Sequence, residues 1–144
     1  MPFRNEGVRP LKAEPTVMHI VDAGLDSPDL TIVLASAWEA FALGERAADA
    51  SAWAPGHDEV QALTAAQACA AGRSLLPLPA TASVVAEYVP DSEHALLPCA
   101  DLLLHTRNVL DQLAAATVSE GCGHLREAAE HAGRAARALQ RVRG

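Results

Sequence analysis

The chain has 144 residues, of which 50% are hydrophobic and only 3% aromatic, and its formal net charge is −7. A single domain of this length buries roughly two thirds of the surface of its unfolded chain, so a core can form without disulfides or metal. A core filled mainly by alanine, leucine and valine favours closely packed helices over a sheet. The acidic balance argues against nucleic-acid binding, which depends on clustered lysine and arginine.

The charge is unevenly distributed along the chain. Residues 1–120 hold six basic and sixteen acidic side chains, whereas residues 121–144 hold five arginines and two glutamates. No stretch approaches the apolar length of a membrane span, and the N-terminus lacks the apolar core of a signal peptide. The three cysteines are then expected to be reduced thiols. These features predict a cytoplasmic protein with no membrane association.

The first predicted element is a short helix that follows a flexible arm. Residues 1–15 are rich in proline and charged side chains, and we expect them to precede a single domain that spans residues 16–144. The segment TVMHIVDAGL is apolar but short, so its periodicity alone does not separate a helix from a strand. We expect a helix there.

The clearest predicted helix covers residues 28–51. Ser27 suits the N-cap and Pro28 the first helical position. Apolar residues then recur at helical spacing: Leu30, Val33, Leu34, Ala37, Phe41 and Ala48. Side chains outside this stripe, such as Trp38, are apolar too. A helix that is apolar around much of its circumference is usually surrounded by neighbours or by a partner chain.

Two further helices are expected at residues 58–76 and 98–119. In the first, a face of mostly small side chains permits close approach to a neighbour: Val60, Leu63, Thr64, Gln67 and Ala71. Cys69 lies opposite this face, so we expect it to be exposed or to contact a partner. Cys99 falls within the apolar stripe of the second helix and is expected to be a packed core thiol. Pro98 either kinks that helix or starts it.

Two smaller features accompany these helices. Asp101 and His105 are four residues apart on a polar stripe, a spacing that predicts an exposed ion pair or hydrogen bond between them. Residues 77–91 are bounded by prolines, and one short helix is expected within them.

The last predicted helix covers residues 122–142 and is amphipathic. Its buried stripe is expected to comprise Leu125, Ala128, Ala129, Ala132, Ala136 and Leu139. The opposite side carries Arg126, Arg134, Arg137 and Arg141. The simplest interpretation is a solvated face whose positive charge suits the helix C-terminus. The alternative is a docking face for an acidic partner or for the acidic body of a second copy.

A metal- or thiol-dependent site is an alternative hypothesis for the function of this chain. In a bundle that runs up-down-up-down, the second and fourth main helices begin at the same end. Four candidate ligands would then meet at that end: His57, Asp58, Cys122 and His124. Imidazole, carboxylate and thiolate groups are ligands for zinc or iron.

A pocket for an apolar small molecule between helices is a second alternative, with Trp38 and Phe41 as candidate lining residues. The chain contains no G-x-S-x-G motif, phosphate loop, dinucleotide-binding fingerprint or Cys-x-x-Cys pair. No motif therefore favours enzymatic activity.

One segment carries a family resemblance. The sequence IVLASAWEAFALGERA, an alanine-rich helix, the segment AEYVPDSEHALLPCADLLLHTRNVLDQLA and a final amphipathic helix follow one another along the chain. This order resembles small uncharacterised helical proteins of actinobacteria over residues 28–144. The matching residues are Ala37, Trp38, Glu39, Ala40, Ala42 and Leu43. The resemblance implies a helical fold and no site residues.

These patterns predict an all-α, single-domain helical bundle with short extra helices. Its four main helices are expected at residues 28–51, 58–76, 98–119 and 122–142. The preferred hypothesis is a non-catalytic protein that forms homo-oligomers or binds another protein, without a cofactor. It rests on the nearly all-round apolar helix and on the opposite charges of the chain's body and tail.

Overall fold

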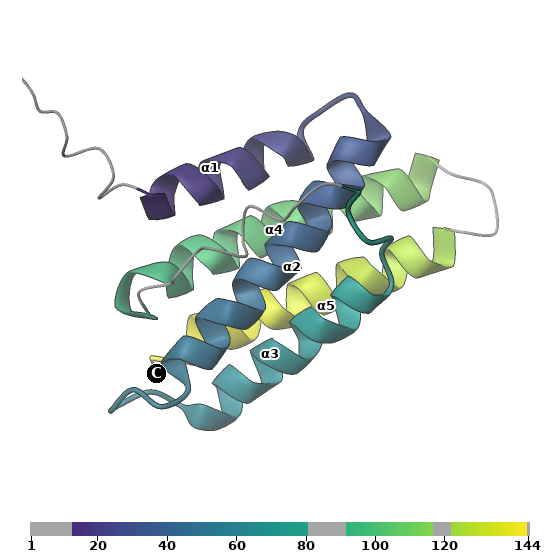
Figure 1. The fold of residues 1–144 in the computed structure, drawn as a ribbon. Helices are drawn as coiled ribbons and strands as arrows, with labels where there is room; N and C mark the ends of the chain where they lie inside the picture. Colours follow the sequence, from purple (N-terminus) through teal and green to yellow (C-terminus); the bar gives the residue numbers. More distant parts are fainter. Residues whose placement is uncertain (1–12, 81–91, 117–121, 144) are drawn as a thin grey trace, which may run out of the picture.

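The computed structural model describes residues 13–80, 92–116 and 122–143, and these residues form five helices and no strand (Figure 1). The helices are α1 (Ala13–Leu25), α2 (Leu30–Ser51), α3 (Glu59–Ser74), α4 (Ser92–Ala116) and α5 (Cys122–Arg141). The all-α prediction is confirmed, and α1 confirms the expected helix near the N-terminus. None of the described helices is long and apolar enough to cross a lipid bilayer.

The helices are arranged around the pair formed by α2 and α4. Figure 1 shows α1 on one side of this pair, whereas α3 and α5 lie on the other side. The backbone N–H of Asp58, at the start of α3, donates to the carbonyl of Val142, just after α5, over 2.6 Å. Because α3 begins where α5 ends, these two helices are antiparallel. The expected up-down-up-down order, in which they begin at the same end, is therefore wrong.

Two helix starts differ from the prediction, each for a local reason. Asp29 rather than Ser27 caps α2, because its carboxylate accepts from the backbone N–H of Thr31 over 2.9 Å. α4 begins at Ser92, six residues before Pro98, which lies inside the helix. Burial of Leu96, which is 1% exposed, gives this first part of α4 a place in the core. Most of the expected arm, residues 1–12, and most of the expected short helix, residues 81–91, lie outside the described part.

α3 packs through a different face from the one predicted. Its buried residues are Ala62, Ala65, Ala68, Cys69 and Gly72, whereas Val60 and Leu63 are 69% and 45% exposed. A Cβ built at Gly44 of α2 would lie 2.7 Å from the Cys69 sulfur, so α2 and α3 approach too closely for larger side chains. Cys69 is consequently buried, and the expectation that it is exposed or contacts a partner is wrong.

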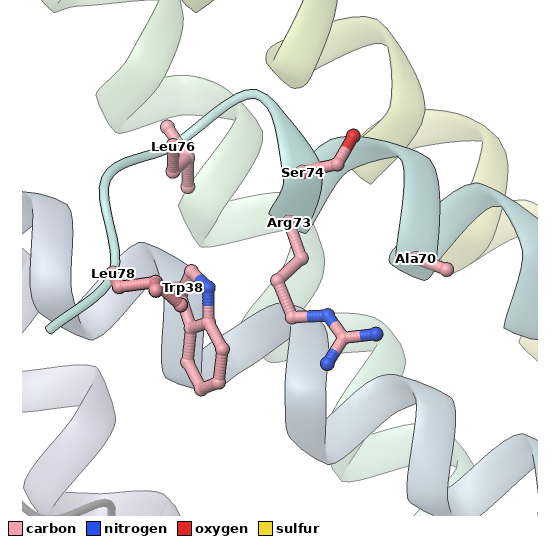
Figure 2. A pocket seen from close by; sticks show the side chains of 6 residues that line it. All are labelled: Trp38, Ala70, Arg73, Ser74, Leu76 and Leu78. Atoms are coloured by element: carbon pink, nitrogen blue, oxygen red, sulfur yellow. The ribbon is translucent and has the colours of Figure 1, made fainter.

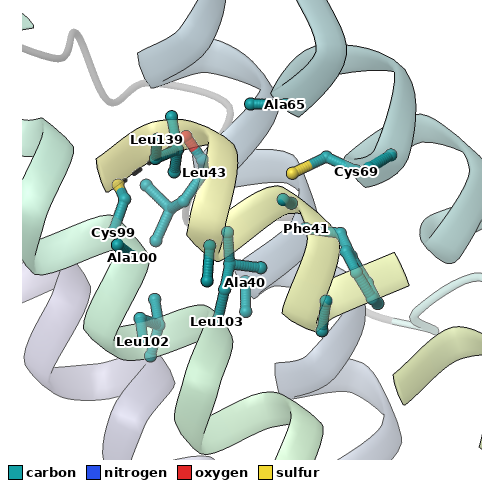
Figure 3. Packing of buried hydrophobic residues seen from close by; sticks show 14 of the residues in the cluster. Ala40, Phe41, Leu43, Ala65, Cys69, Cys99, Ala100, Leu102, Leu103 and Leu139 are labelled. Atoms are coloured by element: carbon teal, nitrogen blue, oxygen red, sulfur yellow. Dashed lines mark hydrogen bonds between the residues drawn. The ribbon is translucent and has the colours of Figure 1, made fainter. Parts of the chain in front are cut away.

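Both described cysteines lie in the apolar core, which Figure 3 shows together with Phe41, Leu43 and Leu103. The Cys99 thiol donates to the carbonyl of Leu43 over 3.9 Å, and its predicted core position is confirmed. Burial is the main cause that raises the pKa of the Cys69 thiol, and the neighbouring Cys99 raises it further. The Cys69 thiol is therefore a packing group and not a reactive thiolate at neutral pH.

Candidate functional site

α5 separates an alanine-rich buried side from an arginine-rich exposed side. Its buried residues are Ala128, Ala129, Ala132, Gly133, Ala135, Ala136, Ala138 and Leu139, which pack against α3 and α4. Five of the six residues predicted for the buried stripe are buried, and Leu125 is partly buried. The arginine face consists of the four predicted residues, Arg126, Arg134, Arg137 and Arg141, and all four are exposed.

The four arginines of the arginine face form few polar contacts with the described residues. The Arg134 guanidinium lies 3.5 Å from the ring nitrogen Nδ1 of His131. Within the described residues, none of the four arginines forms an ion pair with a carboxylate. The four guanidinium groups are therefore available to bind an anionic group from outside the molecule.

A fifth arginine, which the sequence analysis missed, extends this basic surface from α4. A Cβ built at Gly133 of α5 would lie 3.1 Å from Cδ of Arg107 and 3.4 Å from Nη1 of Arg137. The side chain of Arg107 thus crosses α5 where glycine leaves room, and it ends beside Arg137. A glycine in the middle of an alanine-rich amphipathic helix is the sequence signal that could have indicated this contact.

The four residues expected to hold a metal do not converge. Asp58 caps α3, and His57 donates from Nδ1 to the carbonyl of Ser51 over 3.0 Å. Both residues lie at the start of α3, which is next to the end of α5. His124 lies near the start of α5, roughly 27 Å away along the helix axis. Cys122 begins α5, and its side chain is outside the described part. Within that part, no group of three or more His, Cys, Asp or Glu residues is placed to hold a metal ion.

Trp38 lines a surface pocket, whereas Phe41, the other residue expected to do so, is buried in the core. The pocket has a volume of about 330 Å³ (Figure 2), and its lining residues are Trp38, Ala70, Arg73, Ser74, Leu76 and Leu78. The Arg73 guanidinium stacks 5.5 Å from the centre of the Trp38 ring and pairs with Glu45 over 2.8 Å. Because Glu45 balances its charge, Arg73 mainly holds α3 against α2.

An acidic corner lies on the opposite side of the bundle from α5, where α1 ends and α2 begins. We define it by the exposed carboxylates of Asp22, Asp26 and Asp29. Two of them, Asp22 and Asp26, bind the ring nitrogens of His105 over 2.7 Å and 2.9 Å. His105 therefore joins α4 to α1, which corrects the expected pairing of His105 with Asp101 on its own helix.

The His105 ring is best satisfied in its protonated form. Carboxylate oxygens only accept hydrogen bonds, so both ring nitrogens must carry hydrogen to bond both aspartates. Burial lowers the pKa of His105, but the hydrogen bonds and charges of Asp22 and Asp26 together outweigh it and raise the pKa above its ordinary value of 6.5. The imidazolium and the two carboxylates form a clamp that fixes α1.

Comparison with known proteins gives no relative for this chain. No family model, curated protein or solved structure matches it. The resemblance to small helical actinobacterial proteins therefore stays a prediction, and function has to be argued from the surface of the molecule itself.

Proposed function

We propose that this chain is a non-catalytic protein that associates with further copies of itself. In this association, the arginine face of one copy binds the acidic corner of the next copy. The observation that carries the proposal is the set of exposed guanidinium groups on α5 that form no ion pair within the described residues.

The charges of the two surfaces are complementary. The sequence from Ala13 to Asp29 contains four carboxylates and no lysine or arginine. Asp22 and Asp26 remain 53% and 68% exposed although both bind His105. Arginine pairs well with carboxylates because its planar group offers two parallel donors. Such pairing between copies would give specificity and a salt-dependent affinity.

Apolar contacts can accompany this charge pairing. Leu30 and Ile32, beside the acidic corner, are 55% and 46% exposed, which is unusual for large aliphatic side chains. The aliphatic stems of the arginines on α5 offer a matching apolar surface. An interface that combines a partly apolar centre with a charged rim is typical of protein–protein contacts.

The two surfaces lie on opposite sides of the α2–α4 pair, so one copy presents one surface to each of two neighbours (Figure 1). An interface between different surfaces of identical molecules is heterologous. It produces a ring when the rotation closes and an open chain when it does not. We therefore expect association to continue beyond a dimer as concentration rises.

The test is the mass of the protein in solution, measured by light scattering over a range of concentration and salt. We expect wild-type mass to rise with concentration at low ionic strength and to fall as salt is added. The variant Arg134→Gln/Arg141→Gln removes two positive charges from the arginine face and should remain monomeric. Gln61→Glu/Gln67→Glu on α3 produces the same change in net charge and should associate like the wild type.

Two results would contradict the proposal. A wild type that stays monomeric at every concentration would exclude self-association and direct the search to a different acidic partner. Equal association of wild type and Arg134→Gln/Arg141→Gln would show that copies meet through another surface.

A further inference from the structure

We propose that Arg107 of α4 and Arg137 of α5, whose side chains meet beside Gly133, form a binding site for a phosphate group. The ligand class is a small oxoanion, either free phosphate or the phosphate of a small monoester. The site shares Arg137 with the arginine face used in the self-association proposed above, but its second arginine, Arg107, lies on α4, and it does not need Arg134 or Arg141.

One guanidinium nitrogen of each arginine lies near Gly133. A Cβ at Gly133 would lie 3.4 Å from Nη1 of Arg137 and 3.6 Å from Nη1 of Arg107. The two nitrogens are therefore about 7 Å apart at most, a separation that one phosphate group can bridge with a hydrogen bond to each. The two arginines come from different helices, and α4 and α5 pack together along their length, so the fold fixes the two points from which these side chains extend.

The two positive charges of Arg107 and Arg137 favour the binding of an anion. Neither Arg107 nor Arg137 forms an ion pair within the described residues, although Asp111 lies one turn from Arg107 and Glu130 lies two turns from Arg137. The one polar contact that the structure gives Arg107 is a 3.5 Å contact from its guanidinium to the side-chain oxygen of Asn108. Two like charges brought together repel each other, and a shared anion removes that repulsion.

The number and arrangement of the donors favour phosphate over a single carboxylate. Each guanidinium presents N–H donors in a planar fork, which matches two oxygens of one oxoanion. A carboxylate is fully engaged by one such fork. A phosphate has further oxygens and a charge near −2 at neutral pH, so it can bind both arginines at once.

The experiment is a titration of the monomeric wild-type protein with inorganic phosphate, followed by calorimetry and by NMR of the arginine side-chain N–H groups. We expect saturable binding of one phosphate with shifts at Arg107 and Arg137. Arg107→Gln and Arg137→Gln should each weaken binding by about tenfold or more, since each removes charge-assisted hydrogen bonds. Arg126→Gln has the same net charge as either variant and should bind like the wild type.

Two further arms sharpen the test. Gly133→Ala keeps every charge but adds a Cβ between the two arginine side chains, and it should also weaken binding. Methyl phosphate should bind as well as free phosphate if the site takes monoesters, and acetate should bind more weakly than both. Absence of saturable phosphate binding, or equal weakening in Arg126→Gln, would overturn the proposal.

The result separates the two proposals. The variant Arg134→Gln/Arg141→Gln retains Arg107, Arg137 and Gly133. If phosphate binds to a protein that never self-associates, only the proposed function fails. If association depends on the arginine face but phosphate does not bind, only the phosphate site fails.

Discussion

α1 and α5 lie on opposite sides of the α2–α4 pair, and the bundle holds them by different means. α5 buries a continuous alanine-rich side against two helices. α1 buries Val21 and Leu25 and is fixed in addition by the clamp that His105 forms with Asp22 of α1 and with Asp26, the residue after its end. The fold therefore uses charged as well as apolar groups to hold α1, and mainly apolar groups to hold α5.

This difference indicates which charges are available for binding. The carboxylates of Asp22 and Asp26 contribute to the attachment of α1, although they remain partly exposed. The arginines of α5 contribute little to its attachment, because its opposite side already buries the helix. Charged residues that the fold does not need are the better candidates for function, and this contrast is the basis of both proposals.

The largest expected effect is on the buried side of α5. Leu139→Ala should lower the free energy of unfolding by about 2–5 kcal/mol, because the side chain is only 1% exposed and its removal leaves a cavity. Ile20→Ala on α1 is the matched change at a side chain that is 50% exposed, and it should cost less than about 1 kcal/mol. Urea denaturation measures both, and equal costs would remove the contrast between the two helices.

Glycine substitutions provide the next comparison. A Cβ at Gly24 of α1 would collide with the buried side chain of Ser36, so Gly24→Ala should destabilise the protein by about 1–3 kcal/mol. At Gly133 of α5 the neighbours are flexible arginine side chains, and the helix propensity of alanine should make Gly133→Ala neutral or stabilising by up to about 1 kcal/mol. Thermal unfolding should therefore give a lower melting temperature than the wild type for Gly24→Ala and an equal or higher one for Gly133→Ala.

A smaller effect is expected at the clamp. His105→Asn should reduce stability by about 0.5–1 kcal/mol, since the ion pairs are partly exposed and weakened by solvent. Because the pKa of His105 is raised in the folded state, its contribution is complete below the ordinary value of 6.5 and is lost as pH rises through the folded-state pKa.

Hydrogen exchange resolved by residue measures this pH dependence. After correction for the intrinsic exchange rate, amides of α1 should lose protection as pH rises through the folded-state pKa of His105, whereas amides of α5 should not. His105→Asn should abolish the difference between low and high pH. An α1 whose protection is independent of pH in the wild type would show that the clamp contributes nothing to its attachment.

The smallest expected effect on stability is at the arginine face. Arg134→Gln/Arg141→Gln should change the free energy of unfolding of the monomer by less than about 0.5 kcal/mol, because both side chains are exposed and unpaired with any described carboxylate. Denaturation at low protein concentration measures it. A large loss of stability would mean that these arginines serve the fold.

The sequence predicted the buried side of a helix correctly where one helix face differed clearly from the other in composition. The contrast of alanine and arginine on α5 predicted both its buried and its exposed side, and the apolar stripe of α4 placed Cys99 in the core. On α3, alanine occupies several faces, so periodicity could not reveal that Val60 and Leu63 point to solvent. The face that packs is set by the close approach at Gly44, which is a property of two helices together.

Contacts between distant parts of the chain account for the remaining differences. The spacing of Asp101 and His105 on one helix could not indicate that His105 turns toward α1, 79 to 83 residues away in the sequence. The expected convergence of His57, Asp58, Cys122 and His124 depended on helix direction, which the hydrogen bond from Asp58 to Val142 reveals. Arg107 was overlooked because its partner, Gly133, lies on another helix.

The most direct test of the account is a mixing experiment with two charge-reversed proteins. Arg134→Glu/Arg141→Glu cancels the positive charge of the arginine face, and Asp26→Arg makes the acidic corner less acidic, so each protein alone should associate less than the wild type. In an equimolar mixture, the unchanged acidic corner of the first protein can pair with the unchanged arginine face of the second. Light scattering should then detect particles larger than either protein forms alone. A mixture whose mass is the average of two non-interacting species would contradict association through these surfaces.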